Sequence, residues 1–302
     1  MIADMAGRSP ATLAWHRFAA EPVAALAGLF LVALVLLTAA APLIEAWLMV
    51  DPNAVDLLAR LEPPSAAHLL GTDELGRDVL LRLLRGGRIS LAVGLCGALL
   101  AALIGTVVGL AAGYAGGAVD GFLMRLTDAV IALPLLPILI VLAAVDLGKL
   151  GLPAGVATGE LASVLRIVVI VALFGWTTTA RLVRASVLSL RTREFVHAAR
   201  ALGAGPARIL RRHILPNALA PLIVATTLSI GNVILAESVL SFLGLGVQPP
   251  LPSWGNMLTG AQELLFESPR LALWPGLLIF LTVLAFNLLG DGLQAALDPR
   301  HG

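Results

Sequence analysis

Long apolar stretches dominate this chain and limit what it can fold into. Residues 89–114 contain no charged side chain, and residues 271–290 are also uncharged. A helix needs about 20 apolar residues to cross the hydrocarbon core of a bilayer. Of the 302 residues, 59% are hydrophobic and 13% are charged, against about 25% charged in a soluble domain. The sequence therefore predicts an integral membrane protein built from helices.

Six stretches are predicted to span the membrane, which makes the fold class an all-α polytopic membrane protein. The fourth has only 14 uncharged residues between its terminal arginines, but arginines at helix ends can snorkel and lengthen the effective span. The first imitates a signal peptide, yet its length and Pro42 favour a retained span. The stretches are residues 23–44, 89–114, about 122–145, 166–181, about 218–240 and 271–290.

These spans divide the chain into four parts: an N-terminal segment (1–22), a first transmembrane helix (23–45), an external loop with an interfacial helix (46–88) and a transmembrane core (89–302). The distribution of Lys and Arg predicts that both termini are cytoplasmic. In that orientation the cytoplasmic segments hold 12 of them and the outer segments hold 8, as expected from the excess of basic residues in cytoplasmic loops. Five arginines in the external loop argue against it.

Three features inside the spans favour particular contacts. Gly105, Gly109 and Gly113 form two overlapping GxxxG steps. Small residues let membrane helices approach closely, although glycine is also simply common in such helices. Pro134 and Pro137 interrupt the third span, which favours either a pathway-lining helix or a kinked structural one. Asn232 lies deep in the fifth span, as does Asn287 in the sixth, and either could hydrogen-bond across helices.

Ionisable residues inside the spans bear on a second class of function. Secondary transporters and channels often place such residues at mid-membrane. Here Asp128, Glu237 and Asp291 lie towards the ends of their spans. We expect them to be solvated or paired, so an ATP-independent transporter or channel is the weaker alternative. A membrane scaffold without a transport role is a third class.

The segment between the fourth and fifth spans reads REFVHAARALGAGPARILRRHILP over residues 193–216. Its apolar spacing predicts two short helices that are bent at Gly203 and Gly205, with Pro206 opening the second helix and Pro216 ending it. Neither helix is long enough to span a bilayer. The residues leave three interpretations open: an amphipathic helix on the inner leaflet, a docking surface for a cytoplasmic partner, or a plain connecting loop.

The same segment resembles the EAA loop of the membrane subunits of binding-protein-dependent ABC importers. That motif reads EAA, three residues, Gly, nine residues and Ile-x-Leu-Pro. Ala198, Ala199, Gly203, Leu215 and Pro216 match it at the required spacing. His197 stands at the Glu position, and His213 stands at the Ile position. The second departure is typical of one branch, whose members often read HILPN.

Four further blocks resemble that branch, the dipeptide/oligopeptide/nickel group, and its second permease subunit: residues 71–78 (GTDELGRD), 88–91 (RISL), 241–249 (SFLGLGVQP) and 290–299 (GDGLQAALDP). The resemblance implies a type I ABC importer permease fold with a cytoplasmic coupling helix between spans four and five, at about 191–216. It also implies the residues that couple to an ATPase: Phe195, His197, Ala198, Ala199, Leu202, Gly203, Arg208, Leu210, His213, Leu215 and Pro216.

The partners that the resemblance implies are a homologous second permease subunit, two ATPase subunits that bind ATP and Mg, and an extracytoplasmic substrate-binding protein. The location that the resemblance implies is the bacterial cytoplasmic (inner) membrane. Peptides are the expected substrate, with nickel or glutathione as alternatives. The chain itself lacks the GxxxxGK[ST] phosphate loop, because Leu150 follows its only lysine, Lys149. We therefore expect no catalytic residue and no cofactor in this chain.

Metal ions and nucleic acid are not expected ligands. The five histidines are scattered, and Cys96 is the single cysteine, so no metal-ligand spacing is present. A net charge of +1 gives no support for a nucleic-acid partner. The GTDELGRD block is predicted to be a short amphipathic helix that positions span two through i,i+3 and i,i+4 pairs. The residues of those pairs are Asp73, Glu74, Arg77, Asp78 and Arg82.

Overall fold

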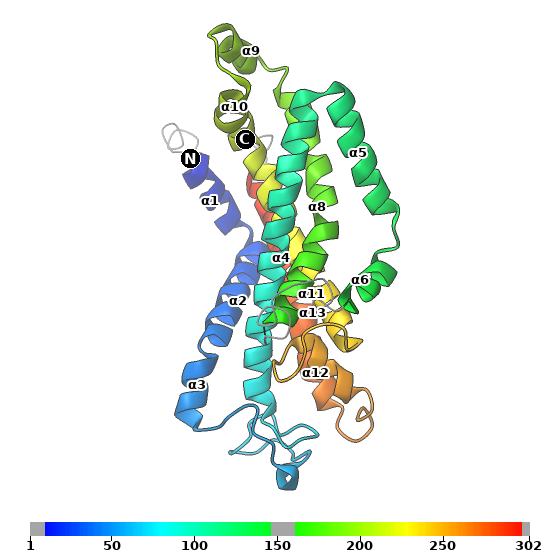
Figure 1. The fold of residues 1–302 in the computed structure, drawn as a ribbon. Coiled ribbons are helices and arrows are strands. Elements are labelled where there is room, and N and C mark those ends of the chain that lie inside the picture. Colours follow the sequence, from blue (N-terminus) through cyan, green and yellow to red (C-terminus); the bar gives the residue numbers. More distant parts are fainter. Residues whose placement is uncertain (1–9, 146–160, 298–302) are drawn as a thin grey trace.

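The computed structural model describes residues 10–145 and 161–297 of the chain, and these form an elongated helical bundle (Figure 1). The described residues contain no β-strand beyond one isolated bridge between Thr72 and Asp78. The helices are α1 (Pro10–Ala20), α2 (Pro22–Ala39), α3 (Ala41–Leu48), α4 (Val79–Ala115), α5 (Gly117–Ala132), α6 (Leu135–Ala143), α8 (Ala162–Leu190), α9 (Glu194–Ala201), α10 (Pro206–Ile209), α11 (Leu215–Phe242), α12 (Trp254–Ala261) and α13 (Arg270–Leu297).

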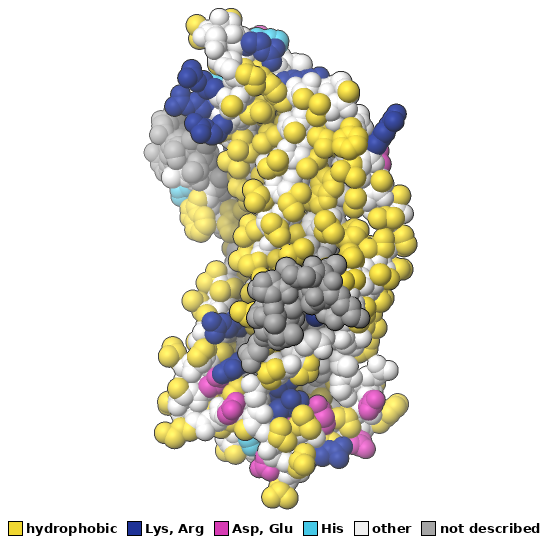
Figure 2. Space-filling view, viewed as in Figure 1, with side chains coloured by type: hydrophobic (Ala, Val, Ile, Leu, Met, Phe, Trp, Pro, Cys, Tyr) yellow, Lys and Arg dark blue, Asp and Glu magenta, His cyan; other side chains and the backbone are white. Residues whose placement is uncertain are grey.

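Five of the described helices are long and apolar enough to cross a membrane, and a sixth crossing is formed if one bent pair counts as a span. The five are α2, α4, α8, the continuous run from Pro206 to Phe242, and α13. Hydrophobic side chains cover the middle of the molecule on the face in Figure 2, while most charged side chains gather towards its two ends. This distribution fits a bilayer around the middle of the bundle.

The bent pair is α5 and α6, which meet at an angle of 85°. Leu133 has extended backbone angles, and Pro134 follows it as the residue that precedes α6. A proline disfavours the helical conformation of the residue before it, so the break falls at this position. The third predicted span is therefore a broken helix instead of a continuous one.

The second spanning helix begins earlier than predicted, and the helix predicted for the GTDELGRD block is wrong. Residues 71–78 form a tight turn, because Gly71 and Gly76 have positive φ angles of 76° and 74°. A Cβ atom at Gly76 would lie 1.7 Å from the Asp56 carbonyl oxygen. Asp78 then caps α4 by accepting a hydrogen bond of 2.9 Å from the backbone N–H of Leu81.

Helices α4 and α8 pack more closely than any other pair in the described part of the bundle. Gly105, Gly109 and Gly113 all face α8, and their backbones touch it directly. Added Cβ atoms at these glycines would lie 2.5 Å from the Trp176 carbonyl oxygen, 2.6 Å from the Ala180 carbonyl oxygen and 2.7 Å from Val187 Cβ, respectively. Such spacing leaves no room for a larger side chain at any of the three positions.

Ion pairs join α5 to α8 at the end of the bundle that carries α9. Arg184 donates to both carboxylate oxygens of Asp120, over 2.5 and 2.7 Å. Arg181 donates to Asp128 over 2.5 Å, so this acidic residue is paired, as expected. Arg191 Nη1 donates to the Gly113 carbonyl oxygen over 3.0 Å and covers the C-terminal end of α4. The start of α1 and the end of α13 lie towards this same end (Figure 1).

Candidate functional site

A cavity of about 720 Å³ opens between the spanning helices. Its wall is built from α4, α8, α11 and both members of the broken pair, α5 and α6. The break contributes directly, because Leu133 and Leu135 on either side of Pro134 line the cavity. In a continuous third helix, Leu133 and Leu135 would lie along one straight axis. The bend between α5 and α6 therefore determines the shape of the cavity wall.

Most of the cavity wall is apolar. The described lining residues include no Asp, Glu, Lys, Arg or His side chain. The polar exceptions are Thr177, Thr178, Thr179, Ser229 and Asn232. Asn232, a predicted pathway residue, thus faces the cavity. Pro134 and Pro137 are not among the lining residues, although Leu133 and Leu135 beside them are.

A second candidate site is the α9–α10 segment, which comprises residues 194–214 and projects from one end of the bundle (Figure 1). Val196, Ile209 and Ile214 are almost fully buried, and they pack in one cluster with Val183 and Val187 of α8. Gly203, at a φ of 80°, turns the chain between α9 and α10. The segment is therefore held against the helix ends through apolar contacts.

The outward face of α9 is exposed. Phe195 is 41% exposed and Leu202 is 89% exposed, whereas Ala199 between them is buried. Phe195, Ala199 and Leu202, which are spaced i, i+4 and i+7, are thus divided between solvent and the bundle. The other predicted coupling residues divide by exposure. The exposed ones are His197, Ala198, Gly203, Arg208 and Pro216, and the half-buried ones are Leu210, His213 and Leu215.

Pro216 does not end the second short helix, so that prediction is wrong. Residues Leu210–Ile214 form a π-helical turn that leads from α10 into α11 without a break. The Leu215 N–H bonds to the Leu210 carbonyl oxygen, five residues back. This wider turn accommodates Pro216, which lacks an N–H and would crowd the carbonyl of a regular helix. The α9–α10 segment is consequently continuous with a spanning helix.

Glu237 is a buried residue that was expected to be solvated or paired. It is fully buried, and its carboxylate accepts hydrogen bonds from Ser90 (2.9 Å) and Ser241 (2.6 Å). Ser90 also accepts the backbone N–H of Trp254, at the start of α12, over 3.2 Å. The expectation fails because α4 and α12 close over this end of α11. The only sequence signal for this buried hydrogen-bonded site was the i,i+4 spacing of Glu237 and Ser241.

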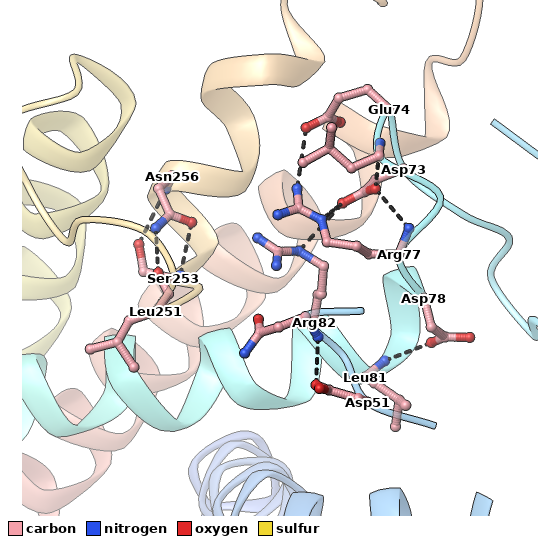
Figure 3. Close-up of polar contacts among 12 residues, drawn as sticks. Asp51, Asp73, Glu74, Arg77, Asp78, Leu81, Arg82, Leu251, Ser253 and Asn256 are labelled. Carbon is pink, nitrogen blue, oxygen red and sulfur yellow. Dashed lines mark hydrogen bonds and ion pairs between the residues drawn. The ribbon is translucent and has the colours of Figure 1, made fainter. Parts of the chain in front are cut away.

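A polar cluster at the opposite end of the bundle fixes the start of α4 (Figure 3). Asp73 accepts hydrogen bonds from the backbone and side chain of Arg77, the latter over 2.7 Å, and lies 3.4 Å from Arg82 Nε. The predicted pairs of Arg77 with Asp73 and Glu74 therefore form within a turn. Nearby, Ser253 and Asn256 cap α12 reciprocally.

Residues 105–301 match a protein family described as "Binding-protein-dependent transport system inner membrane component". The chain is 41% identical over 302 residues to a glutathione transport system permease protein of Pectobacterium atrosepticum, covering 99% of this chain and 94% of that protein. It is also 41% identical over 256 residues to a protein of Brucella suis biovar 1 that is provisionally named a peptide permease, covering 84% of this chain and 80% of the relative.

Two solved structures share the fold. The MetNI methionine ABC transporter in an inward-facing conformation aligns with a TM-score of 0.55 at 20% identity, over 72% of this chain and 97% of that chain. An amino acid ABC transporter with histidines aligns with a TM-score of 0.50 at 16% identity, over 68% of this chain and 89% of that chain. At these identities the likeness concerns the arrangement of helices.

Proposed function

Because this chain belongs to the family of binding-protein-dependent transport system inner membrane components, in which it is an ABC importer permease subunit, we propose that it forms half of a peptide pathway. The cavity between α4, α5, α6, α8 and α11 carries this proposal, since it lies among the spanning helices. Two relatives are named as glutathione and peptide permeases. Both names refer to peptide substrates, because glutathione is itself a small peptide.

Imported glutathione is the second candidate substrate. It is favoured by the relative from Pectobacterium atrosepticum, which aligns with 99% of this chain. Glutathione carries two carboxylates and one ammonium group, whereas a dipeptide with uncharged side chains carries one of each. The described cavity wall offers no cationic side chain to pair with the additional carboxylate. An unpaired charge in an apolar site is costly. We therefore place small peptides without charged side chains ahead of glutathione.

The second part of the proposal concerns the α9–α10 segment, which we assign to docking with an ATPase subunit in the cytoplasm. Exposed apolar side chains with polar flanks suit helix-in-groove binding, and Phe195 and Leu202 offer two such side chains. The buried contacts of Val196, Ile209 and Ile214 would carry a force from α9 to α8 and α11. In this orientation both ends of the described chain face the cytoplasm.

The partners proposed are a homologous second permease subunit, two ATPase subunits and an extracytoplasmic substrate-binding protein. We assign ATP and Mg to the ATPase subunits and no catalytic step to this chain. The chain's own contribution is mechanical: it lines the pathway and transmits the movement of α9. His197 stands on the exposed side of α9, where an imidazole would replace the glutamate of the EAA motif at the docking surface.

Reconstitution of the complete complex in proteoliposomes tests this function. We expect uptake of alanyl-alanine to require ATP, the ATPase subunits and the binding protein, and to stop with a non-hydrolysable ATP analogue. Glutathione offered in competition should reduce uptake less than a second neutral dipeptide does. Uptake by this chain and its partner permease without ATP would contradict the proposal and favour a secondary transporter. Purification of the complex without any ATPase subunit would also contradict it.

A further inference from the structure

We infer that Asn232 recognises the peptide group of the substrate inside the cavity, an inference that rests on the proposed function. The cavity wall must handle the polar backbone of a peptide, whose N–H and C=O groups lose water on entry. A buried peptide group without a hydrogen-bond partner is costly. The wall therefore needs uncharged groups that can both donate and accept, and few of its residues can do so.

Three polar side chains of the lining make no hydrogen bond within residues 10–145 and 161–297: Asn232 on α11, and Thr178 and Thr179 on α8. Thr179 is buried, whereas Asn232 and Thr178 are exposed to the cavity. The Thr177 hydroxyl instead donates to the Phe174 carbonyl oxygen over 3.0 Å. Ser229 likewise donates to the Thr226 carbonyl oxygen over 2.8 Å. The donors of these two hydroxyls are thus occupied by their own helices.

The side chain of Asn232 matches a peptide group in its hydrogen-bonding capacity. Its Oδ1 atom accepts and its Nδ2 atom donates, so one amide can satisfy both the N–H and the C=O of a peptide bond. Phe174, Leu135 and Val233 supply apolar wall in the same cavity for substrate side chains. Recognition of the backbone, with apolar surroundings, explains how one pathway can accept peptides of different sequence.

Replacement of Asn232 by leucine keeps the side-chain size and removes both hydrogen-bonding groups. A matched control is Asn287→Leu on α13, because Asn287 is exposed outside the described cavity lining and donates to the Val283 carbonyl oxygen over 2.9 Å. Uptake of alanyl-alanine is compared with uptake of alanyl-sarcosine, in which the peptide N–H is methylated. The complete complex with saturating binding protein is used, so that effects on capture are the same for every variant.

We expect Asn232→Leu to lower alanyl-alanine uptake about tenfold, which corresponds to about 1.4 kcal/mol, because both hydrogen bonds to the peptide group are lost. Uptake of alanyl-sarcosine should fall less, because that substrate cannot donate to Oδ1. Asn287→Leu should leave both rates unchanged. An equal fall for both substrates, or no fall for either, would overturn the inference while leaving the proposed function intact. Failure of the unsubstituted complex to import either dipeptide would overturn the proposed function, and the inference with it.

Discussion

Replacement of Gly109 by leucine is expected to force α4 away from α8 and to prevent the bundle from forming properly. A Cβ atom at this position would lie 2.6 Å from the Ala180 carbonyl oxygen and 2.8 Å from Val183 Cβ. Backbone atoms cannot rotate out of the way as a flexible side chain can. We expect the substitution to lower the stability of the folded chain by about 3 kcal/mol, at the upper end of the usual cost of overpacking.

Thermal unfolding of the purified complex in detergent measures this effect, together with the yield of monodisperse protein. Gly121→Leu on α5 is the matched control, because no heavy atom of residues 10–145 and 161–297 lies within 4 Å of a Cβ at Gly121. That variant should unfold at the temperature of the unsubstituted protein. Similar behaviour of the two leucine variants would contradict the tight α4–α8 contact.

Replacement of Gly203 by valine is expected to uncouple ATP hydrolysis from transport without unfolding the bundle. Gly203 has a φ of 80°, which β-branched residues adopt only under strain. In the described part of the chain, no atom lies within 4 Å of a Cβ added at Gly203. The effect is therefore conformational. Strain of about 1–3 kcal/mol would displace α9 relative to α10, and we expect uptake to fall by about tenfold or more.

Two controls isolate the backbone effect at this position. Gly203→Asn should retain most of the transport, because asparagine tolerates positive φ angles. Gly205→Ala should also be active, since Gly205 has an ordinary φ of −71° and open space around it. The readouts are dipeptide uptake and the stimulation of ATP hydrolysis by the loaded binding protein. Normal values of both in Gly203→Val would contradict a coupling role for the turn.

Much of the fold could be predicted because hydrophobic length is a property of consecutive residues. The uncharged stretches predicted the spanning helices. The fourth predicted span was short, and the observed helix there, α8, extends from Ala162 to Leu190. Helix ends were less predictable. Whether residues 71–78 form a helix depends on two positive φ angles and on contact with Asp56, which lies farther back in the loop between α3 and α4. Local spacing alone favoured a helix there.

The candidate sites were predictable only to the extent that their residues are contiguous. The α9–α10 segment is one continuous motif, and its turn at Gly203 followed from the sequence. Its rigid support did not, because Val183 and Val187 belong to another helix. The cavity is assembled from five helices, so Asn232 could be proposed as a pathway residue but its partners could not. The burial of Glu237 depends on α4 and α12 in the same way.

Cross-linking from position 202 tests the central claim most directly, namely that α9 meets an ATPase subunit in the cytoplasm. The experiment replaces Cys96 by alanine and introduces Leu202→Cys, or Leu58→Cys as a control. Leu58 is 97% exposed and lies in the loop between α3 and α4, at the end of the bundle opposite α9 (Figure 1). We predict that a thiol-directed cross-linker joins position 202, and not position 58, to an ATPase subunit in the assembled complex. An ATPase adduct from position 58, or none from position 202, would contradict the account.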